Sequence, residues 1–126
     1  MKKILLSLLL LVVTAYAEIK YTDIFDAYDN AKAQNKNVMI MLSMEGCPGC
    51  AYMEDIVFAD KNVAKEMKNF VLVHLDVRAD SIPTNLEYFA TPTFYFLDSD
   101  EKILKRLNGG ENVKDFTATL KAMKAK

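Results

Sequence analysis

The chain has 126 residues and a formal net charge of −1 at pH 7, with 16 basic and 17 acidic side chains. This balance excludes the strongly basic surface on which binding to nucleic acid depends, so we expect no nucleic-acid partner. The length suits one small domain with a single hydrophobic core, and no internal repeat or linker is apparent in it.

Residues 1–17 have the pattern of a secretory signal peptide. Lys2 and Lys3 give a positive start, residues 4–13 are apolar apart from one serine, and Ala15-Tyr16-Ala17 forms a small-x-small cleavage site. The apolar stretch is shorter than the roughly 20 residues that span a bilayer, so an uncleaved anchor is the weaker alternative. We therefore expect cleavage after Ala17, membrane contact only through the signal peptide, and a mature domain of residues 18–126 in the periplasm, with a Gram-negative bacterium favoured.

The first half of the mature chain predicts two helices, each followed or preceded by a strand. A helix is expected from a cap at residue 22 or 23 to about Asn35, because apolar residues recur on one face. A mostly apolar strand follows over residues 37–43, and a second helix begins at the cysteine pair and bends or restarts near residues 60–62. Residues 70–77 are rich in β-forming residues and nearly all apolar, as expected for a strand covered on both faces.

The second half predicts a loop, a hairpin and a helix. Residues 78–91 are expected to form the loop, with a short helical piece near residues 85–89. Residues 93–97 and 102–107 flank a polar turn and predict a β-hairpin. Residues 111–124 carry one apolar stripe at helical spacing. This order of elements predicts a single α/β domain with a mixed four-stranded sheet and helices on both faces.

The most informative motif is Cys47-Pro48-Gly49-Cys50, which directly follows the strand predicted over residues 37–43. A strand that leads into a helix through a tight turn places the first cysteine at the helix N-terminus, where free N–H groups and the macrodipole stabilise a thiolate. We expect Cys47 to be the attacking sulfur, because a lowered thiol pKa raises the reactive fraction at neutral pH. Cys50 lies one helical turn later and is expected to resolve the mixed disulfide.

Two other interpretations of the cysteine pair remain open. As a structural disulfide it would close so short a loop that it removes less than the ~3 kcal/mol of unfolded-state entropy expected for a 15-residue loop. As a Cu(I) site it would draw on Met44 and Met53, since soft sulfur ligands select that ion, although methionine more often fills a core. A closed zinc site usually needs four ligands, and the chain has two cysteines and one histidine. We expect no metal and no cofactor beyond the redox-active disulfide.

Four features together resemble the thioredoxin fold over essentially all of the mature chain. They are the strand before Cys47-Pro48-Gly49-Cys50, the apolar strand ending His74-Leu75-Asp76-Val77, the Thr91-Pro92-Thr93 step, and Gly109-Gly110 before the last helix. The resemblance is to small exported bacterial thioredoxin-like proteins of the CxxC type, and it implies that Pro92 is cis and lies beside the cysteines. It also implies that the backbone of Thr91 pairs with an extended substrate strand, with Gly46 and Pro48 at the same substrate-binding surface.

Two departures from the family pattern concern substrate contact and proton transfer. Gly46 stands where thioredoxins usually have an aromatic residue, and the chain has no Trp, so substrate contact there must differ. The family's buried acid, which helps to take the proton from the second cysteine, falls at Met41. A replacement base must come within hydrogen-bond reach of Cys50, directly or through one water. Four titratable residues are candidates for this proton relay: Glu45, Glu54, His74 and Asp76. For His74 the plainer interpretation is a partly exposed residue near the end of a strand.

These features predict a thiol-disulfide oxidoreductase that acts on exported proteins with thiols or disulfides. Size and fold analogy favour a reductant recharged by a membrane thiol-disulfide electron donor, and a disulfide oxidase or isomerase is the alternative. A binding protein that holds its partners, or Cu(I), without exchange chemistry is a further alternative. We expect the protein to be a monomer.

Overall fold

The computed structural model of the protein describes residues 18–126, so the predicted signal peptide and its cleavage site lie outside the described residues. The helices and strands are, in chain order, α1 (Ile24–Gln34), β1 (Asn37–Ser43), α2 (Pro48–Tyr52), the π-helical turn η1 (Met53–Val57), α3 (Lys61–Met67), β2 (Phe70–Asp76), β3 (Thr93–Leu97), β4 (Ile103–Asn108) and α4 (Val113–Met123). Within residues 18–126, no helix has the length and apolar character that a membrane span requires.

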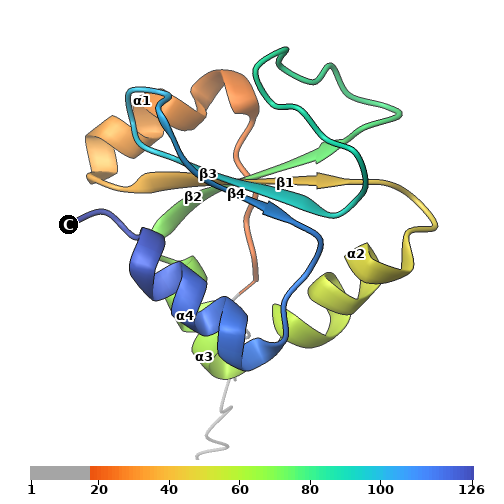
Figure 1. The fold of residues 1–126 in the computed structure, drawn as a ribbon. Helices are drawn as coiled ribbons and strands as arrows, with labels where there is room; N and C mark the ends of the chain where they lie inside the picture. The colour runs from red at the N-terminus through yellow and green to blue at the C-terminus, as the bar shows by residue number, and fades with distance from the viewer. Residues whose placement is uncertain (1–17) are drawn as a thin grey trace, which may run out of the picture.

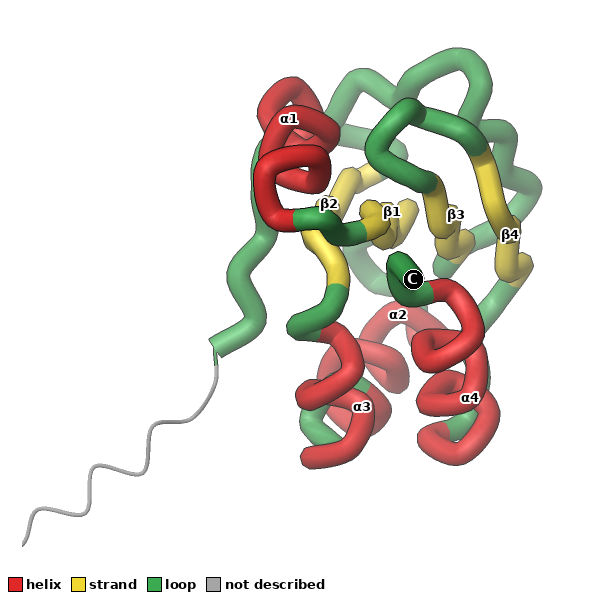
Figure 2. The backbone as a smooth tube through the Cα atoms, turned by 90° about the vertical axis from the view of Figure 1, so that its left-hand side faces the viewer, coloured by secondary structure: helices red, strands yellow, loops and turns green. Residues whose placement is uncertain are grey.

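The four strands form one sheet in the order β2-β1-β3-β4, in which β1 is parallel to β2 and antiparallel to β3. Helix α1 covers one face of this sheet, whereas α2, α3 and α4 lie against the other (Figure 1, Figure 2). Strands β3 and β4 form the predicted antiparallel hairpin. The prediction of a mixed four-stranded sheet with helices on both faces is therefore confirmed.

Short polar side chains decide where three of the helices begin. Asp23 starts α1 by accepting a hydrogen bond from the N–H two residues later, at 2.9 Å. Asp60 starts α3 by accepting from two N–H groups of the first turn, at 2.9 and 3.1 Å, and Asn112 caps α4 in the same way at 2.8 Å. Each cap gives a partner to an N–H group that has none inside the helix. The predicted restart near residues 60–62 follows from the second cap.

Strand β1 is buried on both faces because its alternate side chains enter two different cores. Met39 and Met41 pack with side chains of the helices α2, α3 and α4. Val38, Ile40 and Leu42 pack on the side of α1. Burial on both faces explains why the strand is almost entirely apolar in sequence.

The segment between β2 and β3 differs from the prediction of a short helix near residues 85–89. The structure has turns and bends there and no helix. Leu86 donates its N–H to the Pro83 carbonyl at 3.0 Å, and its buried side chain anchors the segment to the core on the α1 side. Ile82 is partly buried against the same core, whereas Tyr88 and Phe89 remain exposed, so residues 85–89 have no apolar helical face to bury. The last helix also begins two residues later than expected, after its cap.

Replacing Phe116 with alanine is expected to lower the free energy of unfolding by about 3–5 kcal/mol, as is typical of a fully buried phenylalanine. The Phe116 ring is fully buried, with its centroid 5.3 Å from that of Phe94 and 5.9 Å from that of Phe58. The control Phe25→Ala removes a side chain that is 88% exposed and should cost less than about 0.5 kcal/mol. Urea denaturation of both variants measures the difference, and equal losses would contradict this assignment of the core.

Candidate active site

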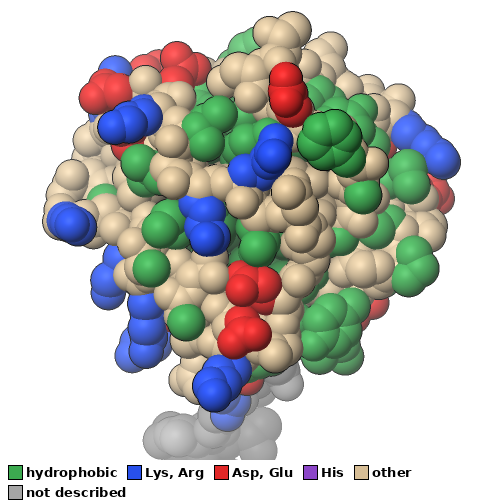
Figure 3. Space-filling model, viewed as in Figure 1, with side chains coloured by type: hydrophobic (Ala, Val, Ile, Leu, Met, Phe, Trp, Pro, Cys, Tyr) green, Lys and Arg blue, Asp and Glu red, His purple; other side chains and the backbone are tan. Residues whose placement is uncertain are grey.

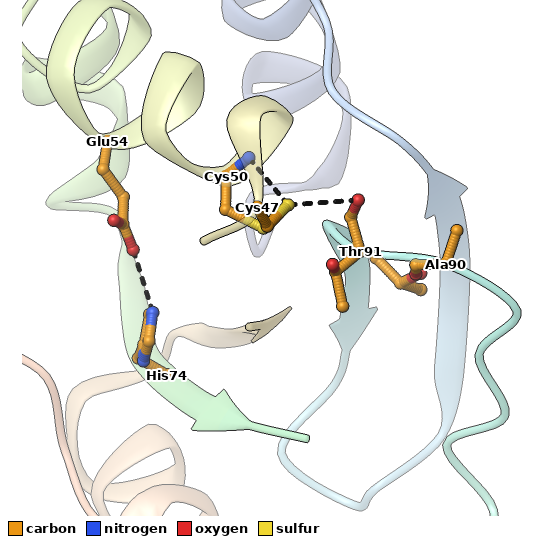
Figure 4. The surroundings of a disulfide bond; sticks show 7 residues. Cys47, Cys50, Glu54, His74, Ala90 and Thr91 are labelled. Atoms are coloured by element: carbon orange, nitrogen blue, oxygen red, sulfur yellow. Dashed lines mark hydrogen bonds and ion pairs between the residues drawn. A yellow bond between two sulfur atoms is a disulfide. The ribbon is translucent and has the colours of Figure 1, made fainter. Parts of the chain in front are cut away.

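The two cysteines lie where the chain passes from β1 into α2. The turn requires a left-handed backbone conformation at one residue, and Gly46 supplies it with a φ of 76°. Cys47 then caps α2, because its Sγ accepts the N–H of Cys50 at 3.2 Å, and Pro48 takes the first helical position. The two cysteines form a disulfide, with their Cα atoms 5.3 Å apart (Figure 4). The CxxC pair is thus held at the beginning of a helix.

The two cysteines differ in their solvent exposure. Cys47 is 8% exposed and Cys50 is 2% exposed. A molecule that approaches from solvent therefore meets Cys47 first. Both cysteines belong to the same core as Met41, whose side chain is fully buried. The β1 position at which the family resemblance implied a buried acid is apolar in this protein.

On one side of the disulfide lies the backbone that leads into β3. Cys47 Sγ is 3.4 Å from the carbonyl oxygen of Thr91, and the Thr91–Pro92 peptide bond is cis (Figure 4). The helix approaches this segment closely, since a Cβ added to Gly49 would lie 3.1 Å from Pro92 Cδ. Thr93 donates its hydroxyl to the Ala90 carbonyl at 2.7 Å, which ties the two ends of the step together. Thr91 and Pro92 are therefore next to the sulfur that solvent reaches first.

On the other side of the disulfide lies a hollow of about 230 Å³. The two cysteines and Gly46 line this hollow. So do all four candidates for proton transfer, namely Glu45, Glu54, His74 and Asp76. His74 Nε2 is 2.9 Å from Glu54 Oε1, and Figure 4 shows this pair on the side of the disulfide away from Thr91. The His74 side chain is 28% exposed, as predicted for a residue near the end of a strand.

The other two candidates, Asp76 and Glu45, have different surroundings from those of His74 and Glu54. Asp76 accepts hydrogen bonds from the N–H groups of Arg78 and Ala79 at 2.8 and 3.2 Å, so its carboxylate stabilises the turn after β2. Glu45 is exposed at the rim of the hollow. The contact between Glu54 and His74 joins residues that are 20 positions apart. The only signal for it in the sequence is that Glu54 follows Cys50 by one helical turn.

The two methionines considered as copper ligands have different positions. Met44 is partly buried and lines the hollow. Met53 is fully buried and packs so closely on the chain before α4 that a Cβ added to Gly110 would lie 2.8 Å from its Sδ. Met53 is thus a core residue. Among residues 18–126, no group of three or more His, Cys, Asp and Glu side chains has the arrangement of a metal site.

Apolar side chains are exposed around the end of the molecule that carries the cysteines. Large hydrophobic residues that keep more than a third of their surface include Tyr52 at the end of α2, Ile56 in η1, and Tyr88 and Phe89 before β3. Figure 3 shows hydrophobic side chains gathered on the right-hand part of the face drawn in Figure 1, over α2 and the segment before β3. Charged side chains of both signs lie on the same face, among further hydrophobic and uncharged groups. Such an apolar surface is typical of a site for another protein.

Comparison with known proteins supports a relationship to thiol:disulfide interchange proteins. The chain is 30% identical over 102 residues to the thiol:disulfide interchange protein DsbD of Tatumella citrea, a match that covers 75% of this chain and 18% of that protein. DsbD of Yersinia enterocolitica is 30% identical over 93 residues, which is 68% of this chain and 16% of its own length. The chain thus spans less than a fifth of the length of these curated relatives.

Solved structures match the fold. A thioredoxin from Thermus thermophilus has a TM-score of 0.68 and 24% identity, with 82% of this chain and 85% of that chain covered. The C-terminal domain of DsbD from Neisseria meningitidis has a TM-score of 0.68 and 18% identity, with 83% and 99% covered. Residues 24–124 match the family described as Thioredoxin-like domain. The fold, the CxxC pair and this match over most of the chain agree, and the protein belongs to the thioredoxin-like domain family.

Proposed function

We propose that this protein is an exported thiol-disulfide oxidoreductase, a thioredoxin-like reductant of disulfides in other exported proteins. The observation that carries the proposal is the Cys47–Cys50 disulfide at the beginning of α2, with Cys47 Sγ 3.4 Å from the Thr91 carbonyl oxygen. Exchange requires a reactive sulfur that a substrate can reach and a second sulfur next to it. The relationship to proteins named thiol:disulfide interchange proteins supports the same chemistry.

The proposed cycle begins with both cysteines reduced. The N–H of Cys50 points at Cys47 Sγ and favours its thiolate, which attacks one sulfur of the substrate disulfide. A mixed disulfide forms between Cys47 and the substrate, and the other substrate sulfur leaves as a thiolate. Cys50 then attacks Cys47 Sγ, which releases the second substrate sulfur and closes the Cys47–Cys50 disulfide. Two electrons pass from the protein to the substrate, and no cofactor takes part.

We assign substrate binding to the backbone of Thr91 and Pro92 and to the turn at Gly46 and Pro48. Pro92 has no N–H group to donate, and its carbonyl oxygen already accepts the N–H of Gly109 at 2.8 Å. We therefore assign pairing with an extended substrate strand to the backbone of Thr91, one residue earlier. Gly46 and Pro48 are exposed on the approach to Cys47. The apolar side chains around this end of the molecule would contact the substrate chain on either side of its cysteine.

Export to the periplasm and a membrane electron donor complete the proposal. The pattern of residues 1–17 supports export, and so does the relationship to DsbD. Outside the cytosol the glutathione and thioredoxin systems do not keep thiols reduced, so an exported reductant must receive electrons across the membrane. We therefore assign a membrane thiol-disulfide protein as the donor, and a monomer as the form that meets it.

Two cysteine variants test the exchange reaction. Cys47→Ser is expected to abolish disulfide reduction, because no attacking sulfur remains, whereas Cys50→Ser should accumulate mixed disulfides with exported proteins. Non-reducing gels of cells that produce each variant measure the trapped species, and the double variant is the control. If Cys50→Ser captures no exported protein, the exchange reaction is wrong; if both variants keep their partners, the protein is a binding protein.

The equilibrium reduction potential tests the direction of electron flow. A reductant should have a potential near the value of about −270 mV found for thioredoxin. Titration of the purified protein against dithiothreitol and glutathione, with thiol alkylation as the readout, measures it. A potential above about −180 mV would instead identify an oxidase or isomerase.

A further inference from the structure

The resolving cysteine lies beside a buried strand face that offers no base. Cys50 is 2% exposed, and Met41 is fully buried in the same core. A thiol in such surroundings holds its proton, because burial disfavours the thiolate. Cys50 nevertheless has to lose that proton before it can attack Cys47. The base must therefore come from a neighbouring element.

His74 is the titratable residue that the sheet pairs with Met41, the position of the missing acid. The parallel register of β1 and β2 pairs Met41 with His74. His74 alternates with Val73 and Leu75, which pack on the α1 side, so its imidazole lies on the face of the sheet that carries the cysteines. It lines the hollow that Cys47 and Cys50 also line. A titratable ring thus stands one strand away from the position of the buried acid.

Glu54 holds this imidazole from the helix side. It belongs to η1, the π-helical turn that directly follows the helix of the cysteines, and its Oε1 is 2.9 Å from His74 Nε2. Tyr21, which precedes α1, packs against the imidazole, with its ring centroid 5.2 Å from that of His74. Burial, with the Glu54 carboxylate as a second cause, raises the pKa of Tyr21 to about 12, so this wall stays uncharged at physiological pH. The pair therefore has a fixed orientation and opens toward the hollow.

The other charged groups that face His74 are all carboxylates. Asp76 and Glu45 line the hollow with the cysteines, and Asp23 and Asp80 line a second hollow that His74 also borders. No lysine or arginine lines either hollow, all of whose lining residues fall within 18–126. His74 is thus the one basic side chain among these groups.

We propose that the Glu54–His74 pair is the acid–base group that takes the proton of Cys50 when the mixed disulfide is resolved. This inference rests on the proposed exchange reaction. The hollow of about 230 Å³ has room for the one water that connects the Cys50 thiol to the pair. Glu54 acts as the positioning residue, because it orients the imidazole and balances its charge.

The step is balanced in atoms and electrons. In the mixed disulfide, Cys47 is bonded to a substrate sulfur and Cys50 carries a thiol. The thiol proton passes through the water to the pair. The Cys50 thiolate attacks Cys47 Sγ: the bond between Cys47 and Cys50 forms, and the bond between Cys47 and the substrate sulfur breaks. The substrate sulfur leaves with the electron pair of that bond and receives the proton back from the Glu54–His74 pair.

Reaction of the reduced protein with 5,5′-dithiobis(2-nitrobenzoate) separates the two sulfur attacks. Attack by Cys47 releases one thionitrobenzoate, and resolution by Cys50 releases a second, so stopped-flow absorbance records two phases. His74→Gln and Glu54→Gln should each slow the second phase at least tenfold at pH 7, since a general base typically contributes about 10²–10⁴-fold. The first phase should stay within twofold. Asp55→Asn, a neighbouring exposed carboxylate outside the hollow, is the control and should change neither phase.

Three further readouts separate proton transfer from a merely structural role. Added imidazole should restore the second phase of His74→Gln, and the pH dependence of that phase should flatten in both variants. The double variant should be no slower than the slower single variant, because the two residues act as a unit. A second phase within twofold of the unmodified protein in both variants would overturn the inference, as would equal slowing of both phases. Absence of the first phase in the unmodified protein would overturn the exchange reaction itself.

Discussion

Strand β1 is hydrogen-bonded on both sides, and its register pairs Leu42 with Thr93 and Ser43 with Asp76. These pairs bring three chain segments together at the end of the sheet where β1 and β2 finish and β3 begins: the turn into α2, the end of β2 and the step into β3. A shift by one residue would turn every side chain of a strand to the opposite face. Because β1 is buried on both faces, such a shift would expose both cores at once. Hydrophobic burial of β1 therefore fixes the positions of the cysteines, of Thr91 and of His74 relative to one another.

Different chemical groups lie on the two sides of the disulfide at this end of the sheet. The backbone carbonyl of Thr91 lies beside Cys47 on one side, whereas the titratable side chains line the hollow that both cysteines border on the other. In the proposed reaction, a substrate polypeptide would approach on the first side and leave the second side open to water. The reacting sulfurs would then exchange with a protein on one side and with a proton on the other. The asymmetry follows from the mixed sheet, since β3 and β2 lie on opposite sides of β1.

Much of this architecture is predictable from local sequence patterns. The apolar runs indicate the strands, Asp23 and Asp60 mark where helices start, and Cys47-Pro48-Gly49-Cys50 after a strand indicates the redox pair. The contact between Glu54 and His74 is not predictable in this way, because it depends on the parallel register and on a π-helical turn, neither of which has a local signal. The failed expectation of a helix near residues 85–89 has a similar cause: a single buried side chain, Leu86, decides the path of that segment.

The Glu54–His74 contact is partly exposed, so these titratable side chains do not belong to the hydrophobic core on which folding depends. An acid buried on β1 would have to be desolvated, and its removal or addition would disturb the packing of the core. Glu54 and His74 keep 39% and 28% of their side-chain surface, whereas Met41 is fully buried, so we expect substitutions at the pair to disturb the core less than an acid at position 41 would. Such a site can be altered by exchanging two partly exposed residues, without a change in the hydrophobic core that supports it.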